Sequence, residues 1–84
     1  MRYSAEVDVV TEEITAADWI AEAMDYSVET VLLDAEGPGG GWPLFRVTGE
    51  RENVVRFLCE RWLGGGAIES DLADAGVEIE EVAK

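Results

Sequence analysis

The side chains that most often carry enzyme chemistry are scarce in this chain of 84 residues, which has no histidine and one cysteine, Cys59. Histidine is the commonest general base and a frequent metal ligand, and a cysteine nucleophile is usually activated by a nearby imidazole. Cys59 falls on the apolar side of a predicted helix, where a packed thiol is the expected role. The sequence therefore excludes histidine chemistry and does not favour cysteine catalysis.

Carboxylates are abundant, but their spacing is not typical of a reaction or of a bound ion. With 19 acidic residues in the chain, paired carboxylates arise from composition alone and do not identify an acid–base pair. Glu69, Asp71 and Asp74 lack the spacing of a calcium-binding loop. The run EGPGGG at 36–41 lacks the lysine and the following helix of a phosphate-binding loop. We expect no enzyme activity, no metal and no cofactor.

Charge is distributed unevenly along the chain, whose formal net charge is −13. Residues 1–41 carry ten acids and one arginine, and residues 64–84 carry six acids and one lysine. Residues 42–63 have four arginines and three glutamates. Direct binding of nucleic acid is not expected, because no basic patch is large enough to bind a phosphate backbone. An acidic surface suits another protein that has a basic patch.

Length and composition indicate one domain over residues 1–84. Hydrophobic residues make up 48% of the chain, which supplies material for one core. The single cysteine cannot form an intramolecular disulfide, and no stretch is typical of a signal peptide or of a membrane span. We expect a cytoplasmic protein that does not bind membranes. The near absence of lysine and asparagine, whose codons are AT-rich, favours a GC-rich bacterial, phage or mobile-element genome.

The clearest change of hydrophobic period lies within Gly41–Gly66. Trp42–Thr48 alternates as a strand, with Phe45 and Val47 on one face. A helix capped by Thr48 or Gly49 follows, and three glycines after residue 63 end it. Helical spacing places one apolar arc on that helix, formed by Val54, Val55, Leu58, Cys59 and Trp62.

The preceding part of the chain is predicted to be a strand, a helix and a strand. Arg2–Val10 alternates, and its dry face consists of Tyr3, Ala5, Val7 and Val9. Thr15 caps a helix from Ala16 to about Tyr26, whose predicted buried residues are Ala16, Ala17, Ile20, Ala23 and Met24. Val28–Ala35 is the next strand, with Leu32 facing away from the core and three residues facing it, namely Val31, Leu33 and Ala35.

The turn at 36–41 joins this strand to the next one as a hairpin. Near the carboxyl end we predict a short helix over Ile68–Ala75, closed by Gly76, and a last strand over Val77–Val82. The order β-α-β-β-α-β is satisfied most simply by one four-stranded antiparallel sheet in the order 4-1-3-2, with both helices on one face.

This element order resembles the ferredoxin-like, or split β-α-β, architecture over nearly the whole chain. ACT-type regulatory domains share that architecture and bind small molecules at a dimer edge. Their glycine-led ligand turn after the first strand is absent here, where residues 9–15 read VVTEEIT. The resemblance is one of element order and implies an α+β fold with one bare sheet face.

The bare sheet face is predicted to be half acidic and half apolar. Its predicted members are Arg2, Glu6, Asp8, Leu32, Trp42, Leu44, Arg46, Glu78 and Glu80. An exposed Trp42 beside Leu44 is typical of a contact surface. The alternative is that Trp42 folds over the hairpin or is covered by the carboxyl-terminal tail. RNA binding is not expected on this face, because the neighbouring side chains are acidic.

Two features of the predicted helices add to this surface. Asp18, Glu22 and Asp25 recur on one helix face, where like charges destabilise the helix by a few tenths of a kcal/mol per pair. This stripe either imitates phosphates or is a plain solvated face. Phe57 lies outside the apolar arc of its helix, so either that arc is wider than predicted or Phe57 points outward with Arg61.

The leading prediction is a small acidic, non-enzymatic protein-binding module that acts as an inhibitor or adaptor. The alternatives are a nucleic-acid mimic that inhibits a DNA-binding protein, an ACT-like regulatory domain, and a structural or assembly subunit. A homodimer formed through the bare sheet face is also compatible with the pattern. The predicted partner-binding residues are Trp42, Leu44, Phe57, Arg61, Asp18, Glu22 and Asp25.

Overall fold

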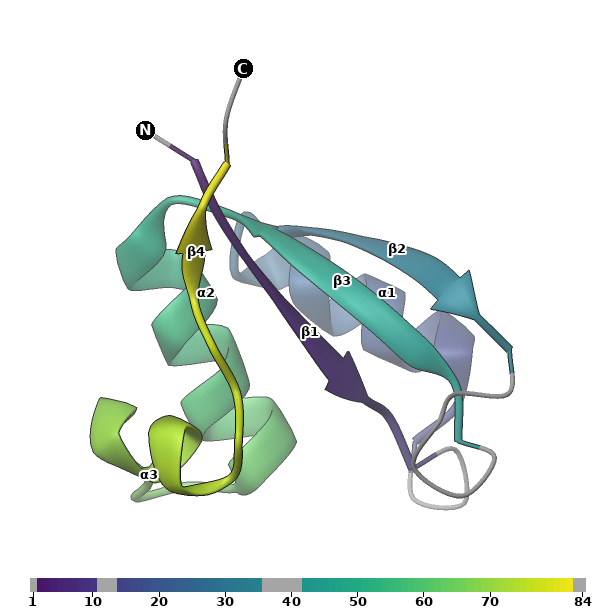
Figure 1. The fold of residues 1–84 in the computed structure, drawn as a ribbon. Helices are drawn as coiled ribbons and strands as arrows, with labels where there is room; N and C mark the ends of the chain where they lie inside the picture. Colours follow the sequence, from purple (N-terminus) through teal and green to yellow (C-terminus); the bar gives the residue numbers. More distant parts are fainter. Residues whose placement is uncertain (1, 11–13, 36–41, 83–84) are drawn as a thin grey trace.

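The computed structural model describes residues 2–10, 14–35 and 42–82, which form one α+β domain (Figure 1). The elements are β1 (Tyr3–Asp8), α1 (Ala16–Asp25), β2 (Glu29–Asp34), β3 (Leu44–Gly49), α2 (Arg51–Phe57), the π-helical segment η1 (Leu58–Leu63), α3 (Glu69–Asp74) and β4 (Glu80–Glu81). All neighbouring strands pair antiparallel, in the order β2-β3-β1-β4. The predicted element order and sheet order are confirmed.

The two central strands, β1 and β3, supply the sheet's share of the core. The buried side chains on these two strands are Ala5, Val7, Phe45 and Val47, each at most 2% exposed. Because side chains alternate between faces, Glu6 and Arg46 lie on the opposite face, where they form an ion pair at 3.2 Å. The predicted alternation of both strands is confirmed.

Helix α1 is rotated about its axis relative to the prediction. Trp19 and Ala23 are its buried residues, whereas Ile20 and Met24 are 43% and 71% exposed. The indole N–H of Trp19 donates a hydrogen bond to Thr30 Oγ1 at 3.0 Å, which ties this helix face to β2. Burying the large indole outweighs burying alanines. The predicted burial was wrong for Ala16, Ala17, Ile20 and Met24.

Strand β2 has the opposite orientation of faces from the one predicted. Leu32 pairs with the buried Phe45, whereas Val31 pairs with the exposed Arg46. Leu32 therefore lies on the helix side of the sheet, together with Thr30, and Val31 lies on the open face. A shift of one residue exchanges the two faces of a strand, and the apolar run of this strand does not select between them. The prediction that Val31, Leu33 and Ala35 face the core was wrong, since all three are exposed. Leu32 does not belong to the open face.

Helix α2 continues directly into η1, and their apolar face is wider than predicted. Phe57 is 0% exposed. Its ring centroid lies 4.7 Å from that of Trp19 and 5.4 Å from that of Tyr26. The segment therefore packs against both the sheet and α1, and the wider arc is the correct interpretation. Phe57 does not serve as a surface anchor. The predicted arc is confirmed, because each of its residues is buried or packs against the core. These residues are Val54, Val55, Leu58, Cys59 and Trp62.

The two helices share one side of the sheet, which lies behind the strands in the view of Figure 1. The ring centroids of Trp19 on α1 and Phe45 on β3 are 6.2 Å apart. The predicted cap of α1 is confirmed, because Thr15 Oγ1 accepts a hydrogen bond from the backbone N–H of Asp18 at 3.1 Å. The core therefore lies between this pair of helices and the inner face of β1 and β3.

The carboxyl-terminal part departs from the prediction only in its last strand. Gly64, with φ of 112°, ends η1, and Gly76, with φ of 86°, follows α3. Both positions match the predicted helix ends, because glycine adopts positive φ without steric cost. The strand predicted over Val77–Val82 is shorter, since β4 spans two residues. The predicted turn at 36–41 lies outside the described residues.

Candidate protein-binding surface

The open face of the sheet carries cross-strand ion pairs around its apolar side chains. Trp42 and Leu44, the predicted anchors, are half-buried. The ion pairs on this side are Arg46 with Glu6 at 3.2 Å and Arg2 with Glu29 at 3.0 Å. Exposed ion pairs of this kind contribute little stability, but they lower the net charge of the face. The two predicted anchors are therefore only partly accessible to a partner.

The acidic stripe on α1 is partly neutralised by an arginine of η1. Asp18 and Asp25 are exposed, and Glu22 is half-buried. The carboxylate of Glu22 pairs with the guanidinium of Arg61 at 3.3 Å. Arg61 also lies over the ring of Tyr26, with its Cζ 5.8 Å from the centroid. The structure thus brings two of the predicted site residues together and leaves the two aspartates facing solvent.

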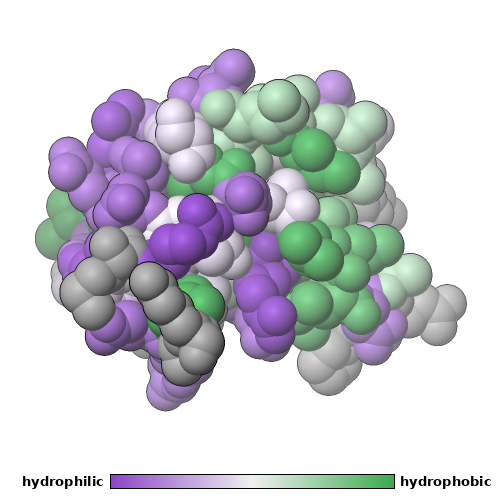
Figure 2. All heavy atoms as spheres, turned by 90° about the horizontal axis from the view of Figure 1, so that it is seen from above, coloured by the Kyte–Doolittle hydropathy of each residue, from purple (hydrophilic) through white to green (hydrophobic). Residues whose placement is uncertain are grey.

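Most of the exposed large hydrophobic side chains gather at the outer edge of β2. In the described part of the chain eight such residues are exposed, and five of them lie on β2 and α1. Figure 2 shows apolar atoms gathered on the side of the molecule where these two elements lie in Figure 1. We call these five residues the β2 edge patch: Val31 (56% exposed), Leu32 (50%), Leu33 (38%), Ile20 (43%) and Met24 (71%).

The rotation of α1 places its exposed apolar residues on the flank toward the outside of β2. Glu22 pairs with Arg61 of η1, so that flank of α1 faces the second helix. Successive residues of an α-helix turn by about 100°, which places Ile20 and Met24 on the opposite flank, toward the outside of β2. Leu32 points to the same side of the sheet as α1. Leu32 and the α1 members of the patch therefore lie on the same side of the sheet, and Val31 lies on the other side of the same strand edge.

The backbone of β2 is open along the same edge, because β2 ends the sheet within the described residues. Val9 donates to the carbonyl of Pro43 at 2.9 Å, so the odd-numbered residues of β3 bond to β1 and its even-numbered residues bond to β2. Arg46 is therefore hydrogen-bonded to Val31, so the backbone N–H and C=O groups of Val31 point toward β3. The residues whose N–H and C=O groups point outward are Thr30 and Leu32.

The β2 edge patch carries no charge in a chain whose formal net charge is −13. Glu29, at the start of β2, is paired with Arg2 at 3.0 Å. The exposed acids of α1, Asp18 and Asp25, lie beside the patch and not within it. The surface is therefore an apolar strip between acidic surroundings.

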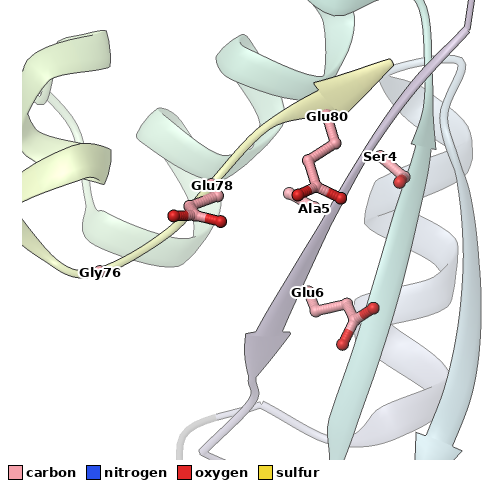
Figure 3. Close-up of a pocket in the computed structure, with 6 residues that line it drawn as sticks. All are labelled: Ser4, Ala5, Glu6, Gly76, Glu78 and Glu80. Atoms are coloured by element: carbon pink, nitrogen blue, oxygen red, sulfur yellow. The ribbon is translucent and has the colours of Figure 1, made fainter. Parts of the chain in front are cut away.

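An acidic groove of about 270 Å³ lies between β1 and the segment that leads to β4 (Figure 3). In the described part of the chain β1 and β4 pair only at Tyr3 and Ser4, so β1 separates from the segment before β4 after Ser4. In Figure 3 the carboxylate of Glu6 turns toward β3, away from Glu78 and Glu80. Within the described ranges, no three acidic or cysteine side chains are placed to hold a metal ion. The acidic side chains that line the groove therefore do not point toward one common ligand position.

A second hollow, of about 480 Å³, lies between α2 and the start of α3. The guanidinium of Arg51 and the carboxylate of Glu69 form a two-point ion pair across it, with Nη1 and Oε1 2.9 Å apart. The hydrogen bond from Arg51 lowers the pKa of Glu69 and raises the pKa of Arg51. This pair joins α3 to α2 and leaves both groups ionised at neutral pH.

Cys59 is 5% exposed and lies in the core cluster. Burial raises the pKa of its thiol, and the charges of Asp71 and Glu69 act in the same direction. A raised pKa disfavours the thiolate, which is the reactive form. The predicted packing role of Cys59 is confirmed.

Comparison of the chain with protein-family models, with curated proteins and with solved structures found no match in any of the three. Among the described residues, the helices are too short or too polar to cross a membrane. Sequence reasoning missed the β2 edge patch, although a signal was present. The run Val31–Leu33 is apolar at consecutive positions, so at least one of these side chains must leave the core whichever face of the strand is buried.

Proposed function

We propose that this protein is a non-enzymatic protein-binding module that docks another polypeptide on the β2 edge patch. One observation carries the proposal: five exposed apolar side chains border the open backbone edge of β2. Contiguous apolar patches and unprotected strand edges are both typical of contact surfaces. The proposed surface differs from the one expected from sequence, which was centred on Trp42 and Leu44.

Docking would proceed by addition of a strand to β2. An extended segment of the partner would bond to the outward N–H and C=O groups of Thr30 and Leu32. Its side chains would cover Val31 on the open face, and the exposed residues of α1 on the other face. The main-chain bonds would supply affinity, and the apolar side chains would supply specificity.

The acidic surroundings would influence the rate of association more than the affinity. Asp18 and Asp25 lie beside the patch and favour the approach of a partner that carries basic residues. Glu22 pairs with Arg61, so the stripe offers less charge than the sequence suggests for a nucleic-acid mimic. For this reason we base the proposal on the apolar patch and not on the stripe.

We also interpret the architecture as ferredoxin-like, with η1 and α3 inserted between α2 and β4. The sheet order β2-β3-β1-β4 and the position of both helices on one side support this interpretation. In such an arrangement β2 is an edge strand, and its outer side is accessible to a partner.

The test compares partner affinities of matched variants. Proteins retained by the immobilised chain are identified, purified and titrated against the wild type and Leu32→Lys. We expect Leu32→Lys to weaken binding at least tenfold, because a charge at a strand edge opposes strand addition. Ile68→Lys is the control, since Ile68 is 63% exposed and lies at the start of α3, away from β2 (Figure 1).

Equal affinity of every partner for the wild type and for Leu32→Lys would contradict the proposed surface. If Trp42→Ala abolished binding while Leu32→Lys did not, the open face of the sheet would be the contact surface instead.

A further inference from the structure

We infer that the polypeptide bound by the β2 edge patch is a second copy of this chain, with the two β2 strands paired antiparallel about a two-fold axis. The inference rests on the proposed function, because it assigns an occupant to the same surface. Two four-stranded sheets would then form one continuous eight-stranded sheet.

The free edge of β2 permits a self-complementary register. The outward backbone groups belong to Thr30 and Leu32, which are two residues apart. If the axis passes beside Val31, Thr30 of each copy lies opposite Leu32 of the other, and each such pair exchanges both N–H···O bonds. Val31 then lies opposite Val31, as a pair without direct backbone bonds. A contact of this kind, with the same surface on both sides, is closed and forms no fibre.

The side chains around this axis are compatible on both faces. On the open face the two Val31 side chains would be in contact. Beyond Leu32 the pairing of β2 with β3 shifts register, and Leu33 of one copy would lie near Glu29 of the other, which is already paired with Arg2. On the helix side, the two copies of Leu32 would be covered by the α1 side chains of the patch, Ile20 and Met24.

Of the surfaces of this acidic chain, the uncharged patch is where two copies repel each other least. Two chains that each carry a net charge of −13 repel each other wherever their acidic surfaces meet. The β2 edge patch is itself uncharged. An acid stands at each end of β2: Glu29 is paired with Arg2, and Asp34 follows Leu33. A basic partner would gain its attraction from the acids outside the patch, whereas a second copy needs an uncharged, apolar surface.

The exposed apolar area is of the size that a dimer requires. From the exposed fractions, the five patch residues present on the order of 500 Å² per copy, within the range of patches that mark contact sites. Complete burial of both patches, backbone included, would remove about 1,000 Å², which is the lower limit of a specific interface. A domain of this length buries only about 60–65% of its unfolded surface, so additional burial is favourable.

The first experiment measures molar mass by light scattering over a range of chain concentrations up to about 200 μM, far above a Kd of about 10 μM. The wild type is expected to approach 18.4 kDa, twice the chain's 9.2 kDa. Val31→Lys should remain at 9.2 kDa, because it would place two ammonium groups side by side at the axis. Ile68→Lys, which changes the net charge equally, should dimerise as the wild type does. Circular dichroism shows whether each variant is folded.

A second experiment tests the register. A pair without direct backbone bonds has Cα atoms about 4.5 Å apart, within the range that a disulfide spans. Mild oxidation of Val31→Cys with diamide should therefore give a covalent dimer, as two thiols transfer two electrons and two protons to diamide. Leu33→Cys should not cross-link, because the two copies of residue 33 would be about 13 Å apart along the strands. Cys59 is buried and should not react.

A wild-type chain that stays at 9.2 kDa throughout would overturn the inference, and so would a Val31→Lys variant that dimerises normally. Equal cross-linking of Val31→Cys and Leu33→Cys would overturn the register. If the chain were monomeric while Leu32→Lys still weakened a foreign partner, this inference would fail and the proposed function would stand. If neither self-association nor partner binding depended on the patch, both would fail.

Discussion

Strands β2 and β3 are neighbours of equal length, six residues each, but their burial is very different. On β3, Phe45 and Val47 are 1% and 0% exposed, whereas on β2, Val31 and Leu32 are 56% and 50% exposed. β3 has a strand on each side and helices across its inner face, while β2 has a strand on one side only. Apolar composition alone therefore does not place a strand in the core. Position in the sheet decides how much of that composition is covered.

The two helices repeat this contrast. The segment formed by α2 and η1 buries Phe57 completely, because the sheet and α1 cover it from two sides. Helix α1 buries Trp19 and exposes Ile20 and Met24 on its outer flank. One side of the domain is therefore closed, and the side formed by α1 and β2 has apolar surface left over for contact.

The largest difference in the free energy of unfolding is expected between the variants Phe57→Ala, on the closed side, and Met24→Ala, on the side of α1 and β2. Removing the fully buried Phe57 ring should lower the free energy of unfolding by about 3–5 kcal/mol, since the cavity it leaves does not collapse completely. Met24 is 71% exposed, so its truncation should cost less than about 1 kcal/mol. Urea denaturation followed by circular dichroism measures both values. Similar losses for the two variants would remove the contrast between the two sides.

A sharper comparison uses one substitution on adjacent strands, Val47→Ala and Val31→Ala. Val47 is 0% exposed, so its truncation should cost about 2–3 kcal/mol. Val31 is 56% exposed, and its truncation should cost less than about 0.5 kcal/mol in the monomer. Denaturation at about 1 μM chain keeps association from adding to the second value. A loss at Val31 as large as that at Val47 would mean that β2 is covered.

The smallest effect is expected at the ion pair that closes the α2–α3 side. The pKa of Glu69 is lowered by Arg51, so the pair stabilises the fold above the ordinary glutamate value of about 4.3. That contribution is lost as the pH falls through the folded-state pKa. Glu69→Gln should therefore lower the free energy of unfolding at pH 7 by well under about 1 kcal/mol, because the pair is exposed to solvent.

The two unfolding curves should converge at acid pH, where Glu69 of the wild type is also neutral. Glu78→Gln removes the same charge without breaking this pair and separates the effect of net charge. A difference that persisted below about pH 3 would show that something other than the ionised pair is responsible.

Local patterns in the chain were sufficient to predict most of the framework. The alternation around Ala5 and Phe45 predicted both central strands and their inner faces, and Thr15 and Gly64 predicted helix ends. These features depend on neighbouring residues, whose spacing is visible in the sequence. Trp42 and Leu44 were expected to anchor an apolar contact surface, and both are half-buried in the structure. The exposed apolar residues on the outer edge of β2 were not expected there, because the faces of that strand were assigned in reverse.

By itself, then, the sequence determined the order of the strands and main helices, the central strands and the scarcity of catalytic side chains. The tertiary structure decided the rotation of α1, the orientation of β2 and the burial of Phe57. In α1 and β2, apolar side chains occur on more than one face, so several orientations bury similar local area. The contacts that select one of them join distant residues, as Trp19 does with Thr30 and Phe57. That selection leaves the outer edge of β2 uncovered, and it is where we place the interaction surface.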